Sequence, residues 1–179
     1  MRRSFLVSCL LLLAFSVPAT LRAQSAASMA PKTENGILKA ADITPALFPD
    51  RVFYAGKTAP TEMRNTGGVR FANGKFFLAG IVDSSGYSTA IKDKYQFYLL
   101  VETPVELGGQ QLKPGAYGAG FMEGKLLVTD LGGNDVFQVP AGRDTAMKRP
   151  VPLQVTAGTA EGTYRLYRGR DYVEFGQSQ

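Results

Sequence analysis

The chain has 179 residues, with 20 Lys and Arg against 15 Asp and Glu, a formal charge of +5, no histidine and one cysteine, Cys9. This composition excludes a Ser–His–Asp triad and a Cys–His pair, and it excludes zinc, haem and iron–sulfur sites built on imidazole or thiolate ligands. Carboxylate chemistry, a Ser–Lys pair and oxygen-ligated calcium remain open.

The first 23 residues have the order of a secretory signal peptide. Two arginines precede an apolar run over residues 5–17, and Ala23 supplies a small residue for cleavage. The run is shorter than the roughly 20 residues that span a bilayer, and Cys9 lies too early in it to be a lipoprotein cysteine. We therefore expect a periplasmic or extracellular protein without a membrane span, cleaved after Ala23 or, alternatively, after Ala19.

Cleavage after Ala23 would change the charge balance. Three of the 20 basic residues lie in the signal segment, so without it the excess over the 15 acidic residues shrinks from five to two. Binding to nucleic acid needs a basic stripe on the folded domain, and we expect no nucleic-acid partner. The remaining chain also has no cysteine for a disulfide, so that its stability must come from its core.

Few helices are predicted after the signal peptide. Residues 24–35 are small and polar, which indicates a flexible leader, and a single β domain is expected over residues 36–179. Residues 36–43 could form one or two helical turns. Thr44-Pro45 offers an N-cap followed by a proline at the first helical position, which predicts one further short turn.

From Arg51 onward, short apolar stretches alternate with turn residues, which predicts strands. Asn73-Gly74 separates two of them and predicts a hairpin with a type I′ turn. Residues 76–82 are apolar at every position, so this strand should be central and covered on both faces. The other strands are expected at 52–54, 69–72, 95–101, 105–107, 110–112, 116–122, 125–129, 136–139, 152–155, 164–167 and 172–175, with one helical turn at 144–148.

This pattern predicts an all-β fold, a single antiparallel β-sandwich or partly closed barrel of short strands, preceded by the signal peptide and the short helical or turn segment. Residues 152–155 contain a proline and should lie at a sheet edge. An exposed edge of this kind could serve assembly by strand addition.

Five glycines occur in the stretch GGQQLKPGAYGAGF. It has neither the spacing of a dinucleotide fingerprint nor the Gly-Lys-Ser/Thr of a P-loop. As a strand, it places Ala116, Gly118 and Gly120 on one face, and glycine inside a strand indicates that something approaches closely. That neighbour could be a large side chain such as Phe97 or Tyr98, or a ligand on a floor of bare backbone.

The first part of this stretch, GGQQLKPGAY from Gly108 to Tyr117, resembles a hairpin of secreted bacterial β-sandwich domains of unknown function. In those domains a strand with Gly-x-x-Leu leads through a small turn into Gly-x-Tyr. The resemblance covers about residues 105–129. It implies export and a sandwich, and it carries over no catalytic residues.

A short loop holds the candidate metal ligands Asp130, Asn134 and Asp135. Oxygen ligands clustered in this way can hold calcium, but the EF-hand spacing is absent. A hairpin loop that uses Gly and Asn for its turn geometry explains the same residues. Calcium is the one cofactor under consideration, and the alternative is no cofactor at all.

The densest arginine–aromatic cluster supplies the candidate ligand-binding residues, which are Arg165, Arg168, Arg170, Tyr167 and Tyr172. Such a cluster could hold a carboxylate, a phosphate or a sugar acid. The alternative is a solvated hairpin in which the arginines pair with Asp171 and Glu174.

The leading hypothesis is an exported β-sandwich that acts as a non-catalytic binding or envelope-associated module, with a small molecule, a glycan or an envelope protein as its partner. A first alternative is a carboxylate-dependent enzyme that acts on a glycan. Asp83 and Glu102, each at the end of a predicted strand, are its best-placed carboxylates. A second alternative is assembly through an exposed edge strand.

Overall fold

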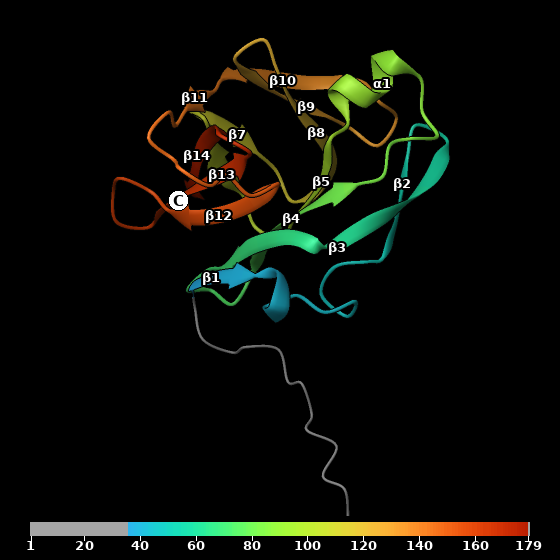
Figure 1. Ribbon diagram of the computed structural model, residues 1–179. Coiled ribbons are helices and arrows are strands. Elements are labelled where there is room, and N and C mark those ends of the chain that lie inside the picture. Colours follow the sequence, from blue (N-terminus) through green and yellow to red (C-terminus); the bar gives the residue numbers. More distant parts are fainter. Residues whose placement is uncertain (1–35, 179) are drawn as a thin grey trace, which may run out of the picture.

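The computed structural model describes residues 36–178, which form two antiparallel β-sheets (Figure 1). The larger sheet has eight strands, β1 (Gly36–Lys39), β2 (Arg51–Tyr54), β3 (Lys57–Arg70), β4 (Phe76–Val82), β5 (Phe97–Val101), β8 (Gly115–Met122), β9 (Lys125–Thr129) and β10 (Asp135–Pro140). The smaller sheet has six, β6 (Val105–Leu107), β7 (Gln110–Leu112), β11 (Gly142–Arg143), β12 (Leu153–Ala157), β13 (Thr163–Arg168) and β14 (Asp171–Gln177). The predicted all-β sandwich is confirmed. The expected signal peptide and leader lie outside the described residues.

The strand order places the long strands at the centre of the larger sheet. That order is β1-β3-β4-β5-β8-β9-β10, with β2 paired to the first part of β3. The smaller sheet has the order β12-β13-β14-β6-β7, with β11 paired to β14. The helices are a 3₁₀ turn, η1 (Ala40–Asp42), and one short α-helix, α1 (Thr89–Lys94). Within residues 36–178, no helix has the length and apolar character that crossing a membrane requires.

The main core lies between the two sheets. It is built from buried aliphatic and aromatic side chains on the facing sides of the strands, such as Leu99 and Leu126 in the larger sheet and Leu166 in the smaller one. Phe77 and Phe175 stack across the interface with their ring centroids 4.1 Å apart. Aromatic pairs of this kind add to the burial of apolar surface that holds two sheets together.

A second core covers the opposite face of the larger sheet. Phe77 and Ile81 of β4 belong to the core between the sheets, whereas Leu78 and Val82 of the same strand pack in this second cluster. The chain over residues 43–54 and the region around α1 supply the other side of that cluster. Strand β4 is therefore central and covered on both faces, as its unbroken apolar sequence predicts.

One side of the sandwich is closed by the chain itself. Strands β10 and β11 are separated only by Ala141 but belong to different sheets, so the chain crosses between the sheets at this point. Next to it, a Cβ on Gly108 would lie 2.7 Å from Cγ2 of Val139. Because the ladders of the two sheets remain separate, the structure is a sandwich and not a barrel.

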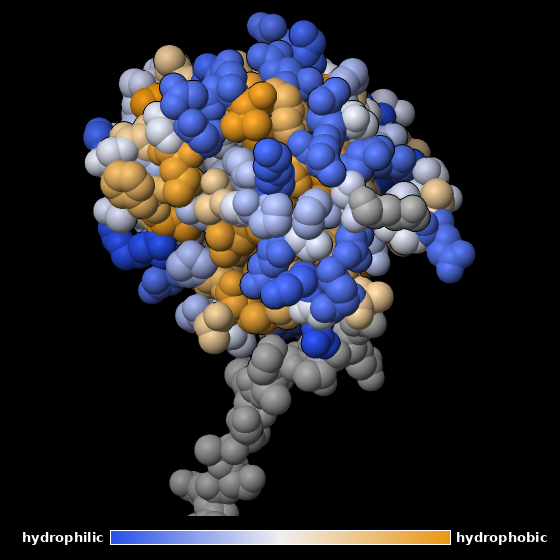
Figure 2. Space-filling view, turned by 180° about the vertical axis from the view of Figure 1, so that it is seen from behind, coloured by the Kyte–Doolittle hydropathy of each residue, from blue (hydrophilic) through white to orange (hydrophobic). Residues whose placement is uncertain are grey.

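The strand order shows which strands lie at the edges of the two sheets. Strand β12 pairs only with β13, so the segment that begins at Pro152 lies at a sheet edge, as expected. Strands β1, β10 and β7 end the remaining ladders. The largest exposed apolar side chains are Phe53, Val136 and Val151, and Figure 2 shows apolar residues among polar ones on the back of the molecule. Assembly through an edge strand stays a prediction.

The turn at Asn73-Gly74 differs from the predicted type I′ geometry. Gly74 has a φ of 79°, but Asn73 is not among the residues with positive φ. The Gly74 N–H donates to the Phe71 carbonyl, and the Phe71 N–H donates to the Lys75 carbonyl, each at 2.9 Å. This is the three-residue loop with a left-handed glycine at its end. Both central residues have positive φ instead at Gly108-Gly109.

The helical expectations are confirmed in part, by the 3₁₀ turn η1 at Ala40–Asp42 and the turn after Thr44, and are wrong for residues 36–39 and 144–148. Residues 36–43 contain β1 and η1, because the first four of them pair with the end of β3. Residues 144–148 form no helical turn; the Asp144 carboxylate instead accepts hydrogen bonds from the N–H groups of Ala146 and Met147. The turn after Thr44 is present, with the Phe48 N–H donating to the Thr44 carbonyl. Helix α1 was not predicted.

Candidate functional site

The glycine face of β8 is packed against protein. A Cβ on Gly118 would lie 2.5 Å from Cε2 of Tyr54 and 3.0 Å from Cδ2 of Tyr95, and a Cβ on Gly120 would lie 2.6 Å from the Asp93 carbonyl oxygen. The neighbours are thus two tyrosines and α1, not the aromatic residues of β5 that the sequence suggested. A ligand floor at this face is excluded, because side chains and backbone already occupy it.

The second core contains four buried tyrosines, Tyr54, Tyr87, Tyr95 and Tyr98. The rings of the first three pack directly against one another. The rings of Tyr54 and Tyr95 stack with centroids 3.8 Å apart, and Tyr87 lies edge-on to both. The Tyr54 hydroxyl pairs with Oγ1 of Thr129 at 2.8 Å, whereas the buried Tyr95 hydroxyl has no hydrogen-bond partner. Burial raises the pKa of Tyr95, so the phenol stays neutral. These contacts hold β2 and α1 on the sheet.

The arginine–aromatic cluster is divided by the structure. Arg165 lies on the outer face of the smaller sheet, where its Nε donates to Oε1 of Glu174 at 2.8 Å. Its guanidinium carbon is 4.6 Å from the ring centroid of Tyr172. Tyr167 is buried beside Tyr172, with ring centroids 5.1 Å apart. The hydrogen bond from Arg165 lowers the pKa of the Glu174 carboxyl group.

The other two arginines of the cluster point elsewhere. Arg170 donates to the Met147 carbonyl through Nε at 3.2 Å and through Nη2 at 2.8 Å. Arg168 donates through Nη1 to the Pro152 carbonyl at 3.3 Å. The three arginines therefore do not converge on one ligand. The expected pairing with Glu174 holds for Arg165 alone.

The acidic loop is occupied by protein donors. Both carboxylate oxygens of Asp130 accept hydrogen bonds from Asn134, whose side chain and backbone N–H thereby lower the pKa of Asp130. Asp135 forms an ion pair with Lys94 at 2.8 Å. Over residues 36–178, no three His, Cys, Asp or Glu side chains gather in a way that could hold a metal ion. The geometry thus gives no support to calcium at Asp130, Asn134 and Asp135.

The two candidate catalytic carboxylates do not form a pair. Asp83 follows the last residue of β4, whereas a carboxylate oxygen of Glu102 accepts a hydrogen bond from the N–H of Phe76, the first residue of the same strand. Seven residues of extended chain separate the two groups by roughly 20 Å. Cooperation of Asp83 and Glu102 on one glycosidic bond is therefore excluded.

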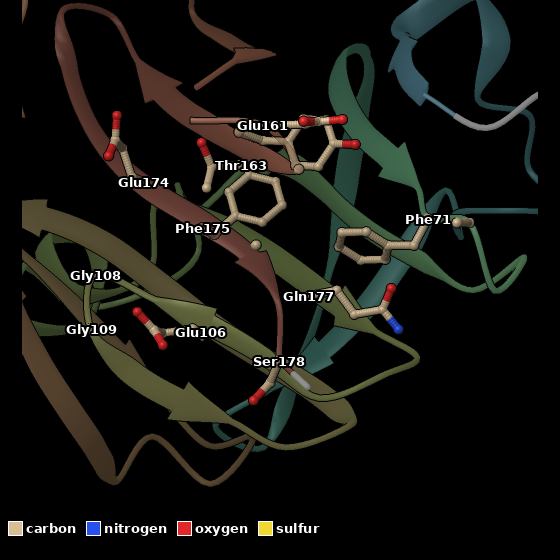
Figure 3. Close-up of a pocket in the computed structure, with 14 residues that line it drawn as sticks. Phe71, Glu106, Gly108, Gly109, Glu161, Thr163, Glu174, Phe175, Gln177 and Ser178 are labelled. Atoms are coloured by element: carbon tan, nitrogen blue, oxygen red, sulfur yellow. The ribbon is translucent and has the colours of Figure 1, made fainter. Parts of the chain in front are cut away.

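A pocket of about 760 Å³ opens at one end of the sandwich, and no single stretch of the sequence indicates it. Figure 3 shows the side chains that line it, from the end of β3, from β6, from the loop before β13 and from β14. Its aromatic lining residues are Tyr164, which is half-buried, and Phe71 and Phe175, which are only 3% and 2% exposed and belong to the core between the sheets. Tyr164 lies between the two phenylalanines, with centroid distances of 6.0 and 5.6 Å.

Three glutamates also line the pocket, and two of them, Glu106 and Glu174, lie on the outer face of the smaller sheet, whereas Phe175 points into the core. Figure 3 shows Glu106, Glu161 and Glu174 among the lining residues. Glu174 accepts hydrogen bonds from Arg165 and, at 3.0 Å, from the Thr159 hydroxyl. Among the described residues, no donor forms a hydrogen bond or ion pair with the carboxylates of Glu106 and Glu161, which are exposed, and no Lys or Arg lines the pocket.

Glycines keep the pocket open. Gly176 of β14 lies opposite Glu106 on one side and Thr163 on the other, where any other residue would project a side chain on the same face as theirs. A Cβ there would lie 3.2 Å from the Gly162 carbonyl oxygen. Gly162 has a φ of 74° and turns the chain into β13. The isolated glutamates and glycines carry no motif by which sequence analysis could have found them.

The fold and the pocket define the class of protein as an antiparallel β-sandwich with an acidic pocket at one end. No protein family, no curated protein and no solved structure matches the chain. The similarity of residues 105–129 to secreted sandwich domains therefore stays a prediction.

Proposed function

We propose that this protein is an exported, non-catalytic binding module that holds a small ligand with a positive charge and an apolar part in the pocket of Phe71, Tyr164 and Phe175. The expectation of export rests on the signal-like residues 1–23. The observation that carries the proposal is that Glu106 and Glu161, two exposed carboxylates without a partner among the described residues, line one pocket together with the half-buried ring of Tyr164.

An ammonium or guanidinium group suits this environment for two reasons. A carboxylate without a protein partner accepts a charge-assisted hydrogen bond, which is stronger than a neutral one. Aromatic faces attract cations and at the same time cover apolar carbon. The pocket volume of about 760 Å³ falls in the usual range for small-ligand sites, which are largely apolar with a few polar groups that orient the ligand.

A glycan-acting enzyme has less support. Glycoside hydrolysis requires a carboxylic acid that stays protonated near neutral pH, so its pKa must be raised. The carboxyl groups of Asp83, Asp130 and Glu174 have perturbed pKa values, and all three are lowered, chiefly by hydrogen bonds from Ser85, Asn134 and Arg165 respectively. The charge of Glu174 is compensated by Arg165, so the negative charge that a ligand could meet in the pocket comes from Glu106 and Glu161.

The proposal is tested with benzylammonium as the probe, followed by NMR of the protein amides. Binding should shift the resonances of Gly108, Gly162 and Gly176. Replacement of Glu106→Gln or Glu161→Gln should each weaken binding about two- to fivefold, the usual worth of a partly exposed charge pair. Glu123→Gln removes an exposed carboxylate from a remote turn and should leave the affinity unchanged.

Benzyl alcohol and benzoate provide matched ligands without the positive charge. Benzyl alcohol should bind more weakly than benzylammonium, and benzoate should not bind. The proposal is overturned if the three glycine amides do not respond to benzylammonium, or if benzyl alcohol binds equally well.

A further inference from the structure

A second cleft, of about 600 Å³, lies at the other end of the β13–β14 hairpin. The pocket described above is lined by Thr163 at the start of β13, whereas this cleft is lined by Arg168 at the end of that strand. Its other wall belongs to the larger sheet, where β4 ends at Val82 and the following residues Ser84 and Ser85 contribute hydroxyl groups. The two sites share no residue.

The acidic groups of this cleft already have protein partners. Three carboxylates line it, and their donors are Asn65 for Glu62, the backbone N–H of Ser85 for Asp83, and Arg143 for Asp171. The Arg143–Asp171 ion pair is 2.6 Å long. Of the three carboxylates, only Asp171 has a cationic partner, whereas the hydrogen bonds to Glu62 and Asp83 each occupy one carboxylate oxygen.

The basic groups of the cleft are in the opposite situation. Arg168 and Lys92 both line it, and within residues 36–178 neither forms an ion pair. Arg168 uses only Nη1, on the Pro152 carbonyl. Its Nε is buried and has no hydrogen-bond partner. A buried donor without a partner is costly, and a small turn of the guanidinium toward an acceptor in the cleft would satisfy it.

One edge of the Arg168 guanidinium has no hydrogen-bond partner among the described residues. With Nη1 on the Pro152 carbonyl, Nε and Nη2 remain, and these two form the side-on edge that binds the two oxygens of a carboxylate or phosphate in parallel. Lysine offers only a point charge, so the planar edge sets the geometry that such a site recognises.

We infer that this cleft binds an oxyanion group, carboxylate or phosphate, between Arg168 and Lys92. The Ser84 hydroxyl is available as a further donor. The inference is independent of the acidic pocket, because the unpaired charges there are negative and lie at the opposite end of the smaller sheet. It also assigns oxyanion binding to Arg168, one of the arginines that the sequence analysis proposed as ligand-binding residues.

The test titrates the full mature chain with inorganic phosphate in one arm and with sodium acetate in the other. Sodium chloride keeps the ionic strength constant, because surface charges are screened by salt. NMR follows the Nε–H resonance of Arg168 and the amides of Ser84 and Ser85. We expect saturable shifts of all three in at least one arm, and the arm that saturates at lower concentration identifies the preferred oxyanion.

Four variants separate binding from general charge effects. Arg168→Gln should weaken binding about tenfold or more, as the loss of charge-assisted hydrogen bonds predicts, whereas Arg168→Lys should restore only part of the affinity. Lys92→Gln should weaken binding a few-fold. Lys113→Gln removes one exposed positive charge from the β7–β8 turn and serves as the matched control, without effect.

The inference is overturned if neither anion shifts the Arg168 resonance, or if Lys113→Gln lowers affinity as much as Lys92→Gln. Should Arg168→Gln fail to fold, Lys92→Gln and the wild-type titration still decide the outcome, because within residues 36–178 the Lys92 side chain makes no hydrogen bond or ion pair whose loss would unfold the chain.

Discussion

Gly118 lies directly against the ring of Tyr54, where a Cβ would stand 2.5 Å from Cε2. We predict that Gly118→Leu destabilises the protein, because the added side chain must displace Tyr54 and its stacked partner Tyr95. Overpacking of this kind costs about 1–3 kcal/mol, or several degrees of melting temperature at roughly 2–4 °C per kcal/mol. Thermal melting measures the effect.

Gly86→Ala is the matched control for this variant, since no atom lies within 4 Å of the position its Cβ would take. It should melt close to the wild type. Equal melting curves for Gly118→Leu and the wild type would contradict the packing of β8 against the tyrosines.

The tyrosine cluster makes a second prediction through its two buried hydroxyl groups. The Tyr95 hydroxyl has no partner, whereas the Tyr54 hydroxyl pairs with Thr129 at 2.8 Å. Tyr95→Phe removes an unsatisfied buried group and should leave the free energy of unfolding unchanged or raise it by about 1 kcal/mol. Tyr54→Phe should lower it by about 1 kcal/mol. Urea unfolding of the two variants tests the order, and a reversed order would disprove the hydrogen-bond assignment.

The turn before β4 makes a third prediction. Gly74 has a φ of 79°, a region that β-branched side chains occupy at high cost. Gly74→Val should therefore lower stability by about 1–2 kcal/mol, while Gly74→Asn should cost less, because Asn tolerates this conformation. A melting temperature of Gly74→Val equal to that of Gly74→Asn would show that the turn has another geometry.

The ion pair of Arg165 and Glu174 makes a fourth prediction, on pH dependence. The pKa of Glu174 is lowered from its ordinary value of 4.5 by the hydrogen bond from Arg165. The unfolded chain binds the proton first, so the pair stabilises the fold above pH 4.5, and this contribution is lost as the pH falls through the lower pKa of the folded state. The Glu174 side chain is 40% exposed, so solvent keeps the effect small.

The measurement compares urea unfolding of the wild type and Glu174→Gln at neutral and at strongly acidic pH. The difference in unfolding free energy between the two proteins should shrink on acidification. A difference that stays constant with pH would show that the carboxylate contributes no charge-dependent stability.

Local sequence was sufficient for several elements. The unbroken apolar run of β4 predicts a central strand because only a strand with neighbours on both faces can bury every side chain. The hairpin of β8 and β9 follows from Glu123-Gly124, where both residues have positive φ. The sandwich itself follows from the regular spacing of such strands and turns.

Other elements were decided by partners far away in the chain. The first half of β3 is polar and was not predicted, yet it is a strand because β2 pairs with it and supplies the hydrogen bonds that local propensity does not. Residues 36–39 were expected to be helical, but they form the strand β1 because their backbone groups pair with the end of β3.

The sequence by itself excluded a Ser–His–Asp triad, a Cys–His pair and metal centres built on histidine or cysteine. It also determined the fold class through the two-residue period of its strands. Only the tertiary structure decided the sites. Glu106, Glu161 and Phe71 line one pocket although they come from three separate segments of the chain. Arg165 and Arg168 point to opposite faces because they lie three residues apart on β13, and Arg170 lies in the turn that follows. Periodicity is a property of one segment, whereas a pocket is a property of several segments brought together by burial of their apolar faces.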